Sequence, residues 1–524
     1  MIRVLAACFS LLCSSYTAAL TPTTCDSFAA DGTTEQTQRP NILWILAEDL
    51  SPFMGCYDDP INTGHTPAID KLASDGVIFK RAFVPAPVCS ACRSALITGV
   101  MQTTTGTHQH RSSRFTAGEI VPEELRIHLP GGTKTIPELM KGAGYFTFND
   151  GKDDYNFHYD RTALYDVGSA EDYKPGQNGW QGNKGSNFRS ISEKTWRKRP
   201  DKSQPWFGQI QIWGGKANAK HVRAGEKLKP NDVPLPPYFP DVKAQRAAWT
   251  MHYNAARGAD ARVEAILAEL KADGQLENTI VFFFSDHGSN HSLRHKQFCY
   301  EGGLHIPLMI MGNHPSLTAG TVRNELVSGL DISATTLALA GAALPDYLDG
   351  QDLFRENYKP VEHVISARDR CDYTIDRIRT VRSEKMRYIR NYYPDRPMMQ
   401  AQYRDERPVM LALKQGLKDG TLTDYQKEHW FGVRPEEELY DLAADPHQIN
   451  NLASDPKYAV ELEEHREILE SWIEETDDKG QYTEDTRQLK ATFDLWKDRP
   501  IFKNADVNPE YDQFKNLPQD VGAN

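Results

Sequence analysis

Two apolar segments of this chain each end in side chains that could bind a cation. Asn41–Ala47 is followed by Glu48 and Asp49, and Thr279–Phe284 is followed by Ser285, Asp286 and His287. Nearly unbroken apolar runs of this kind predict strands buried on both faces of a parallel sheet. Because ligands of such sheets gather at the carboxyl ends of the strands, both acidic groups would face one rim and together form a cation site.

The donor types at this rim indicate a divalent ion. Carboxylate oxygens are the ligands that calcium prefers, whereas the ring nitrogen of His287 leaves another divalent metal open. Taken alone, either acidic group is more often a turn or a helix cap, because Asp and Ser are good capping residues.

A third group of reactive residues is the run Cys89–Gly99, which reads Cys-Ser-Ala-Cys-Arg-Ser-Ala-Leu-Ile-Thr-Gly. An isolated cysteine is usually a buried structural residue or half of a disulfide. Here the whole run resembles the signature of the formylglycine-dependent sulfatases of the alkaline-phosphatase-like superfamily, in which C-x-P/A-x-R is followed by x-x-L-x-T-G. Its Thr-Gly end indicates a helix that starts just after Cys89 and points its amide donors at an anion.

The resemblance implies a specific chemistry. The family's maturation enzyme oxidises the cysteine, here Cys89, to formylglycine, whose hydrated aldehyde attacks sulfur with one hydroxyl and uses the other to help expel sulfate. Arg93 would place a fixed cation beside it. Ala91 replaces the more usual Pro, and Cys92 replaces the common Ser and leaves a second thiol close by.

The resemblance also implies a metal site. Arg39–Leu50 is similar to the family's opening strand, where two adjacent acids bind calcium, and Asp286-His287 matches its later metal pair. The implied ligands are Glu48, Asp49, Cys89, Asp286 and His287. The family's first acid is typically Asp, so the longer Glu48 could change how the ion is held.

Two lysines match further family motifs. Lys152 lies where sulfatases carry G-K-W-H and would hold the nucleophile and a sulfate oxygen, although the motif's histidine is here Asp154. Lys296 begins a segment similar to K-x-x-x-Y-E-G-G-x-x-x-P and would neutralise the sulfate. Without the resemblance, both would be ordinary surface lysines.

The residues that donate a proton to the leaving group and that select the substrate are less defined. Lys216 falls nearest to the position of the family's leaving-group histidine, with His291 or His295 as alternative donors. Basic residues that suit a polyanionic substrate are His108, His110, Arg111, His291, Arg368 and Arg370. Singly, such residues are more often members of surface salt bridges.

The start of the chain resembles an export signal. Residues 1–19 combine Arg3, the apolar stretch Val4–Leu12 and small residues suited to cleavage, and residues 20–38 form a polar linker. The apolar stretch is shorter than the roughly 20 residues that span a bilayer, so no membrane span is expected. The expected location is secreted, periplasmic or lysosome-like.

The remaining length predicts two structural parts. At 524 residues the chain exceeds the roughly 250–300 that one core usually serves. We expect an α/β catalytic domain over residues 39–358, with a mostly parallel sheet covered by helices on both faces and a helix over 259–272. A smaller α+β subdomain over 359–500, with a short antiparallel sheet, and a tail over 501–524 would follow. Glu438–Leu452 looks like the family's closing motif.

These features favour a calcium-dependent sulfatase that acts on a sulfated sugar or polysaccharide. The formal net charge of −12 argues against a nucleic-acid-binding protein, although it allows a local basic pocket. Related enzymes leave open a sulfamidase that acts on N-sulfated sugars or a phosphate-ester hydrolase. The departures at Glu48, Cys92, Asp154 and Lys216 leave open a degenerate protein that only binds sulfated glycans.

Overall fold

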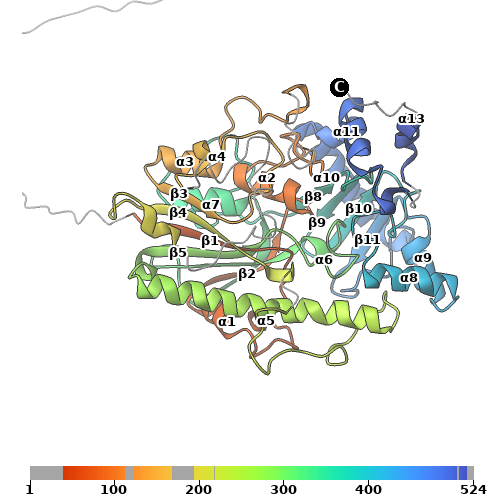
Figure 1. Ribbon diagram of the computed structural model, residues 1–524, viewed down its shortest axis with the longest axis horizontal. Helices are drawn as coiled ribbons and strands as arrows, with labels where there is room; N and C mark the ends of the chain where they lie inside the picture. Colours follow the sequence, from red (N-terminus) through yellow and green to blue (C-terminus); the bar gives the residue numbers. More distant parts are fainter. Residues whose placement is uncertain (1–38, 113–122, 168–193, 217–218, 504–506, 516–524) are drawn as a thin grey trace, which may run out of the picture. The chain divides into compact units, whose positions relative to one another are not determined.

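A seven-stranded sheet with the strand order β3-β4-β1-β5-β6-β2-β7 forms the centre of the protein (Figure 1). The computed structural model describes residues 39–112, 123–167, 194–216, 219–503 and 507–515. Its strands are β1 Asn41–Ala47, β2 Gly76–Phe83, β3 Phe146–Asp150, β4 Trp206–Ile212, β5 Thr279–Ser285, β6 His305–Met311 and β7 Thr321–Ser328. Of these seven, β6 runs antiparallel to both of its neighbours, and the other neighbouring pairs are parallel. The expected mostly parallel sheet is confirmed.

Strands β1 and β5 lie next to each other in the middle of this sheet. All seven residues of each strand are buried, as expected from their apolar sequences. Their parallel register pairs Ala47 with Ser285, so the residues that follow each strand emerge side by side. This register brings Glu48 and Asp286 to one rim.

Helices cover both faces of the sheet (Figure 1). On one face lie α1 (Pro67–Ser74) and α5 (Lys243–Ala272), and on the other lie α2 (Cys89–Thr98), α3 (Ile136–Gly142) and α7 (Asp331–Leu339). The helix expected over 259–272 begins much earlier, at Lys243. Its added turns contain several strong helix formers, mostly Ala and Arg, and Val242 before them is extended.

A separate four-stranded antiparallel sheet follows in the order β11-β10-β9-β8, as expected. Its strands are β8 Val364–Arg368, β9 Ile378–Arg382, β10 Met386–Asn391 and β11 Glu437–Asp441. Helix α10 (Ala459–Thr476) packs on β9 and β10 and buries Leu469 against the sheet. In the sequence between β10 and β11 lie α8 (Pro408–Lys418) and α9 (Asp424–Phe431).

The segment after α10, for which the sequence offers no motif, is folded where it is described. Helices α11 (Thr486–Trp496), α12 (Pro500–Lys503) and α13 (Asp512–Lys515) contribute aromatic side chains to a small core around Tyr373. Two further helices are short: α4 (Arg161–Leu164) and α6 (Glu301–Leu304) (Figure 1). The predicted signal peptide (1–19), the linker (20–38) and parts of the tail (501–524) lie outside the described residues. Within the described ranges, no helix combines the length and apolarity that a bilayer span requires.

Candidate active site

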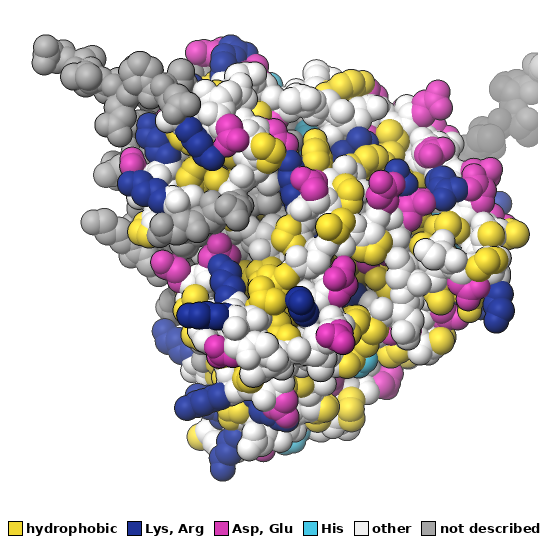
Figure 2. Space-filling model, turned by 90° about the vertical axis from the view of Figure 1, so that its right-hand side faces the viewer, with side chains coloured by type: hydrophobic (Ala, Val, Ile, Leu, Met, Phe, Trp, Pro, Cys, Tyr) yellow, Lys and Arg dark blue, Asp and Glu magenta, His cyan; other side chains and the backbone are white. Residues whose placement is uncertain are grey.

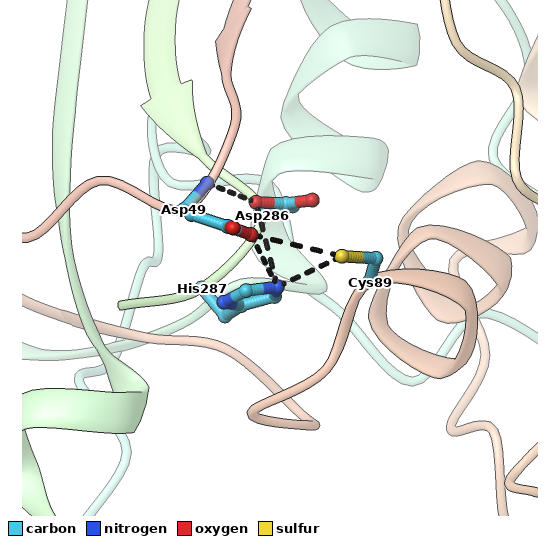
Figure 3. Close-up of side chains that lie close together, drawn as sticks. All are labelled: Asp49, Cys89, Asp286 and His287. Atoms are coloured by element: carbon cyan, nitrogen blue, oxygen red, sulfur yellow. Dashed lines mark hydrogen bonds and ion pairs between the residues drawn. The ribbon is translucent and has the colours of Figure 1, made fainter. Parts of the chain in front are cut away.

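Cys89 is the first residue of α2, and its thiol points towards the rim formed by β1 and β5 (Figure 3). All ten residues of α2 are buried. The Cys89 Sγ lies 3.1 Å from Nε2 of His287 and 3.0 Å from Nζ of Lys296. The helix therefore places a single thiol between an imidazole and an ammonium group.

Backbone and carboxylate groups lock the two strand ends together. Asp49 adopts a positive φ of 55°, and its N–H donates to Oδ1 of Asp286 at 2.9 Å. The N–H of Leu50 donates to Oγ of Ser285 at the same distance. Because Glu48, Asp49 and Asp286 have no exposed surface, this rim holds three carboxylates away from water.

Part of this cluster has the composition of a divalent metal site. One ligand atom from each of Asp49, Cys89, Asp286 and His287 lies within 4.8 Å of all the others (Figure 3). Nδ1 of His287 lies 2.7 Å from the carbonyl of Gly288, which leaves Nε2 directed at Asp49 Oδ1, 3.0 Å away. A ring nitrogen fixed through its partner nitrogen is a common feature of metal-binding histidines. These residues fit a divalent cation.

Glu48 lies beside this group, with its Oε1 3.5 Å from Sγ of Cys89, and it also contacts basic side chains. Its Oε1 pairs with Lys152 and Lys216, and its Oε2 accepts from Nη2 of Arg93 at 2.8 Å. Arg93 also donates from Nε to Oδ2 of Asp286 at 2.9 Å, so one guanidinium bridges the two strand ends. Bidentate or bridging Arg–carboxylate contacts combine charge with fixed geometry.

The lysines surround the thiol from three directions. Lys296 contacts both Cys89 and Asp49, the latter at 3.0 Å, and Lys152 pairs with Asp154 at 2.7 Å. Burial opposes ionisation of the Cys89 thiol, but Lys152, Lys296 and Lys216 outweigh it and lower the Cys89 pKa to about 6. A basic environment of this kind stabilises negative charge at the position of Sγ.

A cavity of about 640 Å³ opens beside these residues. Its lining consists of Arg111, Lys216, Ala244, Ala247, Ala248, Met251, Asn290, His291, Tyr403, Arg407, Pro408 and Val409. Lys216 belongs both to this lining and to the Glu48 contacts, so the cavity adjoins the carboxylate rim. Its volume suits a small organic ligand such as a sugar.

The sulfatase family model matches residues 40–342, the part of the chain that forms the central sheet and the rim. The chain belongs to the sulfatase family. As a member, it is a sulfuric ester hydrolase. It is 31% identical to an ulvan-active sulfatase of Formosa agariphila over 83% of this chain and 75% of the relative. It is 26% identical to the human N-sulphoglucosamine sulphohydrolase over 84% and 90% of the two chains.

Solved structures agree on the fold of this sulfatase. A 2-O GAG sulfatase superposes with a TM-score of 0.58 at 20% identity, over 86% of this chain and 96% of the other. A phosphonate monoester hydrolase of Agrobacterium radiobacter superposes with a TM-score of 0.56 at 18% identity, over 84% and 96%. At such identities the likeness concerns the fold alone.

The structure brings together all nine residues expected to form the reaction centre of the sulfatase. They are Glu48, Asp49, Cys89, Arg93, Lys152, Lys216, Asp286, His287 and Lys296. Of the residues expected to bind substrate, Arg111 and His291 line the cavity. His110 lies 3.5 Å from Asp372, which also pairs with Arg111.

The other three residues expected to contact substrate do not line the cavity. Arg368 pairs with Asp376, and Arg370 makes two hydrogen bonds to Glu484, at 2.7 and 2.8 Å. His108 is buried with Asp369 and Arg379 among its charged neighbours, and burial lowers its pKa. Because both arginines are buried and paired with carboxylates, this geometry gives them a role in holding the C-terminal segments together rather than in gripping a substrate.

Sequence reasoning missed the residues that the C-terminal part contributes. Tyr403 and Arg407 line the cavity, and the buried Arg404 lies between them in sequence. Asn290, which follows β5 in the catalytic domain, lines the cavity too and was also missed. No sulfatase motif covers Tyr403–Arg407. The available signal was a charged run directly before Pro408, because Pro at the first position marks the start of a helix.

Proposed function

We propose that this sulfatase hydrolyses sulfate esters of a sulfated sugar, using a formylglycine formed from Cys89 and a bound calcium ion. The observation that carries the proposal is the position of Cys89 Sγ, 3.0 Å from Lys296 and within the group of potential metal ligands. The activities named for three relatives support the substrate class: an ulvan-active sulfatase, an N-acetylgalactosamine-6-sulfatase and an N-sulphoglucosamine sulphohydrolase.

The residues at this site fit both the calcium ion and the formylglycine. Asp49, Asp286 and His287 would hold the cation, with Glu48 adjacent, and the three carboxylates favour calcium because it prefers oxygen ligands. When bound, the cation supplies positive charge that polarises a sulfate oxygen and favours an ionised nucleophile. The formylglycine, once formed at Cys89, supplies a hydrated aldehyde as that nucleophile.

The basic residues of the chain would bind and orient the sulfate group. Four basic side chains, Arg93, Lys152, Lys216 and Lys296, face four carboxylates, those of Glu48, Asp49, Asp154 and Asp286. These charges cancel, so a divalent cation would leave the site positive and ready for an anionic ester. Fixed charges in a site without water stabilise developing negative charge far better than solvated ones.

The leaving oxygen would receive its proton from Lys216. Burial lowers the pKa of His291 to about 4 and that of His295 to about 3, so both rings are neutral at neutral pH. Burial also disfavours the charged form of Lys216, but Asp49 and Glu48 outweigh it and raise its pKa. Of Lys216 and His291, the two candidate donors that line the cavity, Lys216 is therefore the one that carries a proton. Its raised pKa makes it a weak acid on its own, and a cation bound at Asp49 would offset the carboxylate charge that raises this pKa.

The proposal is tested by sulfate release from a panel of sulfated glycans, after expression in a host that makes formylglycine. Cys89→Ala should abolish release, whereas Cys92→Ser, which changes the neighbouring buried thiol to the family's common residue, should retain it. Peptide mass should show the aldehyde at residue 89 of the wild type. Parallel assays with O-sulfate, N-sulfate and phosphate esters separate the sulfatase from a sulfamidase or phosphatase. Glycan binding without release from any ester, with the aldehyde confirmed, would contradict the proposal.

We further infer that residues 1–19 direct export of this sulfatase and are removed. The combination of Arg3 with the apolar Val4–Leu12 supports this assignment. N-terminal sequencing of the exported protein should find a start near residue 20. A mature protein that retains residue 1 would contradict the inference.

A further inference from the structure

The substrate cavity carries positive charge beyond the lysines and arginine that surround Cys89. Arg111, Lys216 and Arg407 line it, and among the described lining residues there is no Asp or Glu. The protein as a whole is acidic, with a formal net charge of −12. On the face shown in Figure 2, basic and acidic side chains are interspersed. The lining of this cavity is therefore basic, unlike that surface, although Lys216 and Arg111 each pair with a carboxylate that lies outside the lining.

Of the three cations in this lining, Arg407 is the one that has no carboxylate partner among the described residues. Its Nη1 donates to the main-chain carbonyl of Asn290 at 3.2 Å, and no carboxylate of the described residues lies within ion-pair distance of it. The side chain is half-buried, and it directly precedes Pro408, the first residue of α8. Arg404, three residues earlier, anchors the same loop through hydrogen bonds to buried carbonyls. A fixed loop thus presents a guanidinium that can accept an anion.

A second guanidinium of the cavity lining, that of Arg111, lies near the same aromatic ring as Arg407, the ring of Tyr403. Cζ of Arg111 lies 5.2 Å from the centroid of the Tyr403 ring, and Cζ of Arg407 lies 5.9 Å from it. The guanidinium of Arg111 is held by an ion pair with Asp372 at 2.7 Å, and the main-chain N–H of Arg111 donates to Oγ of Ser90 in α2. Two guanidinium groups of the cavity lining therefore lie near the Tyr403 ring, that of Arg111, held by Asp372, and that of Arg407, from the C-terminal part.

The remaining lining suits a sugar ring. Ala244, Ala247, Ala248 and Met251 recur at helical spacing along one side of α5 and form a flat apolar wall. Asn290 also lines the cavity, and its side chain is buried. Its Oδ1 accepts no hydrogen bond from the described residues. A buried acceptor of this kind normally has a partner, which a sugar hydroxyl would supply.

We propose that Arg407, together with Arg111, holds a second anionic group of the substrate, a carboxylate or a further sulfate, on the sulfated sugar or on its neighbour in the chain. The inference rests on the proposed function and narrows it to a sugar that carries two anionic groups. Arginine suits this role because its planar fork pairs with carboxylate and sulfate oxygens in two parallel hydrogen bonds. Lys216 would remain directed at the ester that is cleaved.

The test uses three sulfated sugars that share one sulfate ester: one otherwise neutral, one with an added carboxylate and one with an added sulfate. The wild type should show a higher kcat/KM for at least one of the two doubly anionic sugars than for the neutral one. Arg407→Gln should reduce that preference by roughly 10- to 100-fold, mainly through KM, because a hydrogen-bonded charge pair is lost. Arg407→Lys should restore part of it.

Arg246→Gln is the matched control. Arg246 lies on α5, pairs with Asp241 and does not line the cavity. Its replacement by Gln removes the same charge as Arg407→Gln. Its substrate preference should equal that of the wild type, and thermal unfolding should confirm that the Arg407 variants are folded.

The outcomes separate this inference from the proposed function. If the wild type, with formylglycine confirmed, releases no sulfate from the three sugars and none from the wider panel, the proposed function fails. If its kcat/KM for the neutral sugar equals that for the doubly anionic sugars, or if Arg407→Gln keeps the preference, only the second-anion site fails. Whether the carboxylate or the second sulfate gives the preference identifies the anion.

Discussion

Nη2 of Arg404 donates a hydrogen bond to the main-chain carbonyl of Lys296 at 3.1 Å. The same guanidinium contacts the carbonyl of Asn290 at 3.1 Å and Oε1 of Gln297 at 3.0 Å. Arg404 is 1% exposed and makes no ion pair with the described carboxylates. Its hydrogen bonds therefore join the C-terminal loop to the backbone that carries the proposed sulfate-binding lysine.

Replacing Arg404 by Met should lower both stability and activity. The substitution leaves buried carbonyl and amide oxygens without donors, and we expect a loss of about 2–4 kcal/mol in the free energy of unfolding. Misplacement of Lys296 should lower kcat/KM per folded molecule at least about tenfold, since small errors in position are costly in catalysis. Urea unfolding and steady-state kinetics measure the two effects. An unchanged unfolding curve would show that the hydrogen bonds contribute little.

Gly215 lies so close to Asp49 that it has no room for a side chain. A Cβ at this position would meet the main-chain oxygen of Asp49 at 2.0 Å, and the N–H of Asp49 is itself held by Oδ1 of Asp286. Gly215→Ala should therefore displace Asp49 and strongly reduce both metal affinity and activity. Gly142→Ala in α3, where a Cβ would meet nothing within 4 Å, is the control and should behave as the wild type. Equal metal affinity in the two variants would refute the argument.

Removal of the metal should destabilise the protein. A ligand present at about 100 times its dissociation constant adds about 2.7 kcal/mol to the folded state, so calcium should raise the melting temperature of chelator-treated protein measurably. Asp286→Asn should lose this response. Asp349→Asn is the control, because Asp349 also accepts a main-chain hydrogen bond, from Met101 at 2.7 Å, but lies outside the group of ligands. Titration with calcium, magnesium, manganese and zinc would identify the ion, and a calcium response retained in Asp286→Asn would contradict the site.

Asp331 should make stability depend on pH. Burial raises the pKa of this carboxyl from 3.8 to about 7, although hydrogen bonds from the N–H groups of Gln351 and Ser328 oppose the shift. The folded state therefore holds the proton more tightly than the unfolded chain, and the stability that the proton confers is lost as pH rises through 7.

Asp331→Asn removes this titration and keeps one acceptor oxygen. Relative to the variant, the wild type should lose about 1.4 kcal/mol of unfolding free energy per pH unit between its two pKa values. Urea unfolding of both proteins at about pH 5 and about pH 8 measures the difference. Parallel pH profiles for the two proteins would show that Asp331 stays ionised in the folded state.

The sequence by itself determined the proposed reaction centre and most of the central fold. The acids after β1 and β5 were predictable because two apolar strands in one parallel sheet must end at a common rim. Cys89 and Arg93 were recognisable because the run Cys89–Gly99 resembles the sulfatase signature, and their spacing of four residues along α2 keeps them on the same side of the helix. Contacts of this kind follow from spacing along the chain and from the strand order.

Only the tertiary structure decided which basic residues face the substrate. Arg368 and Arg370 resembled free cations in the sequence, yet their chain fold buries them against Asp376 and Glu484. Arg407 carried no motif, yet the packing of α8 on α5 brings it to the cavity. Burial and ion pairing depend on partners distant in sequence, as with Arg370 and Glu484, 114 residues apart. No local pattern encodes which charges those partners leave uncompensated.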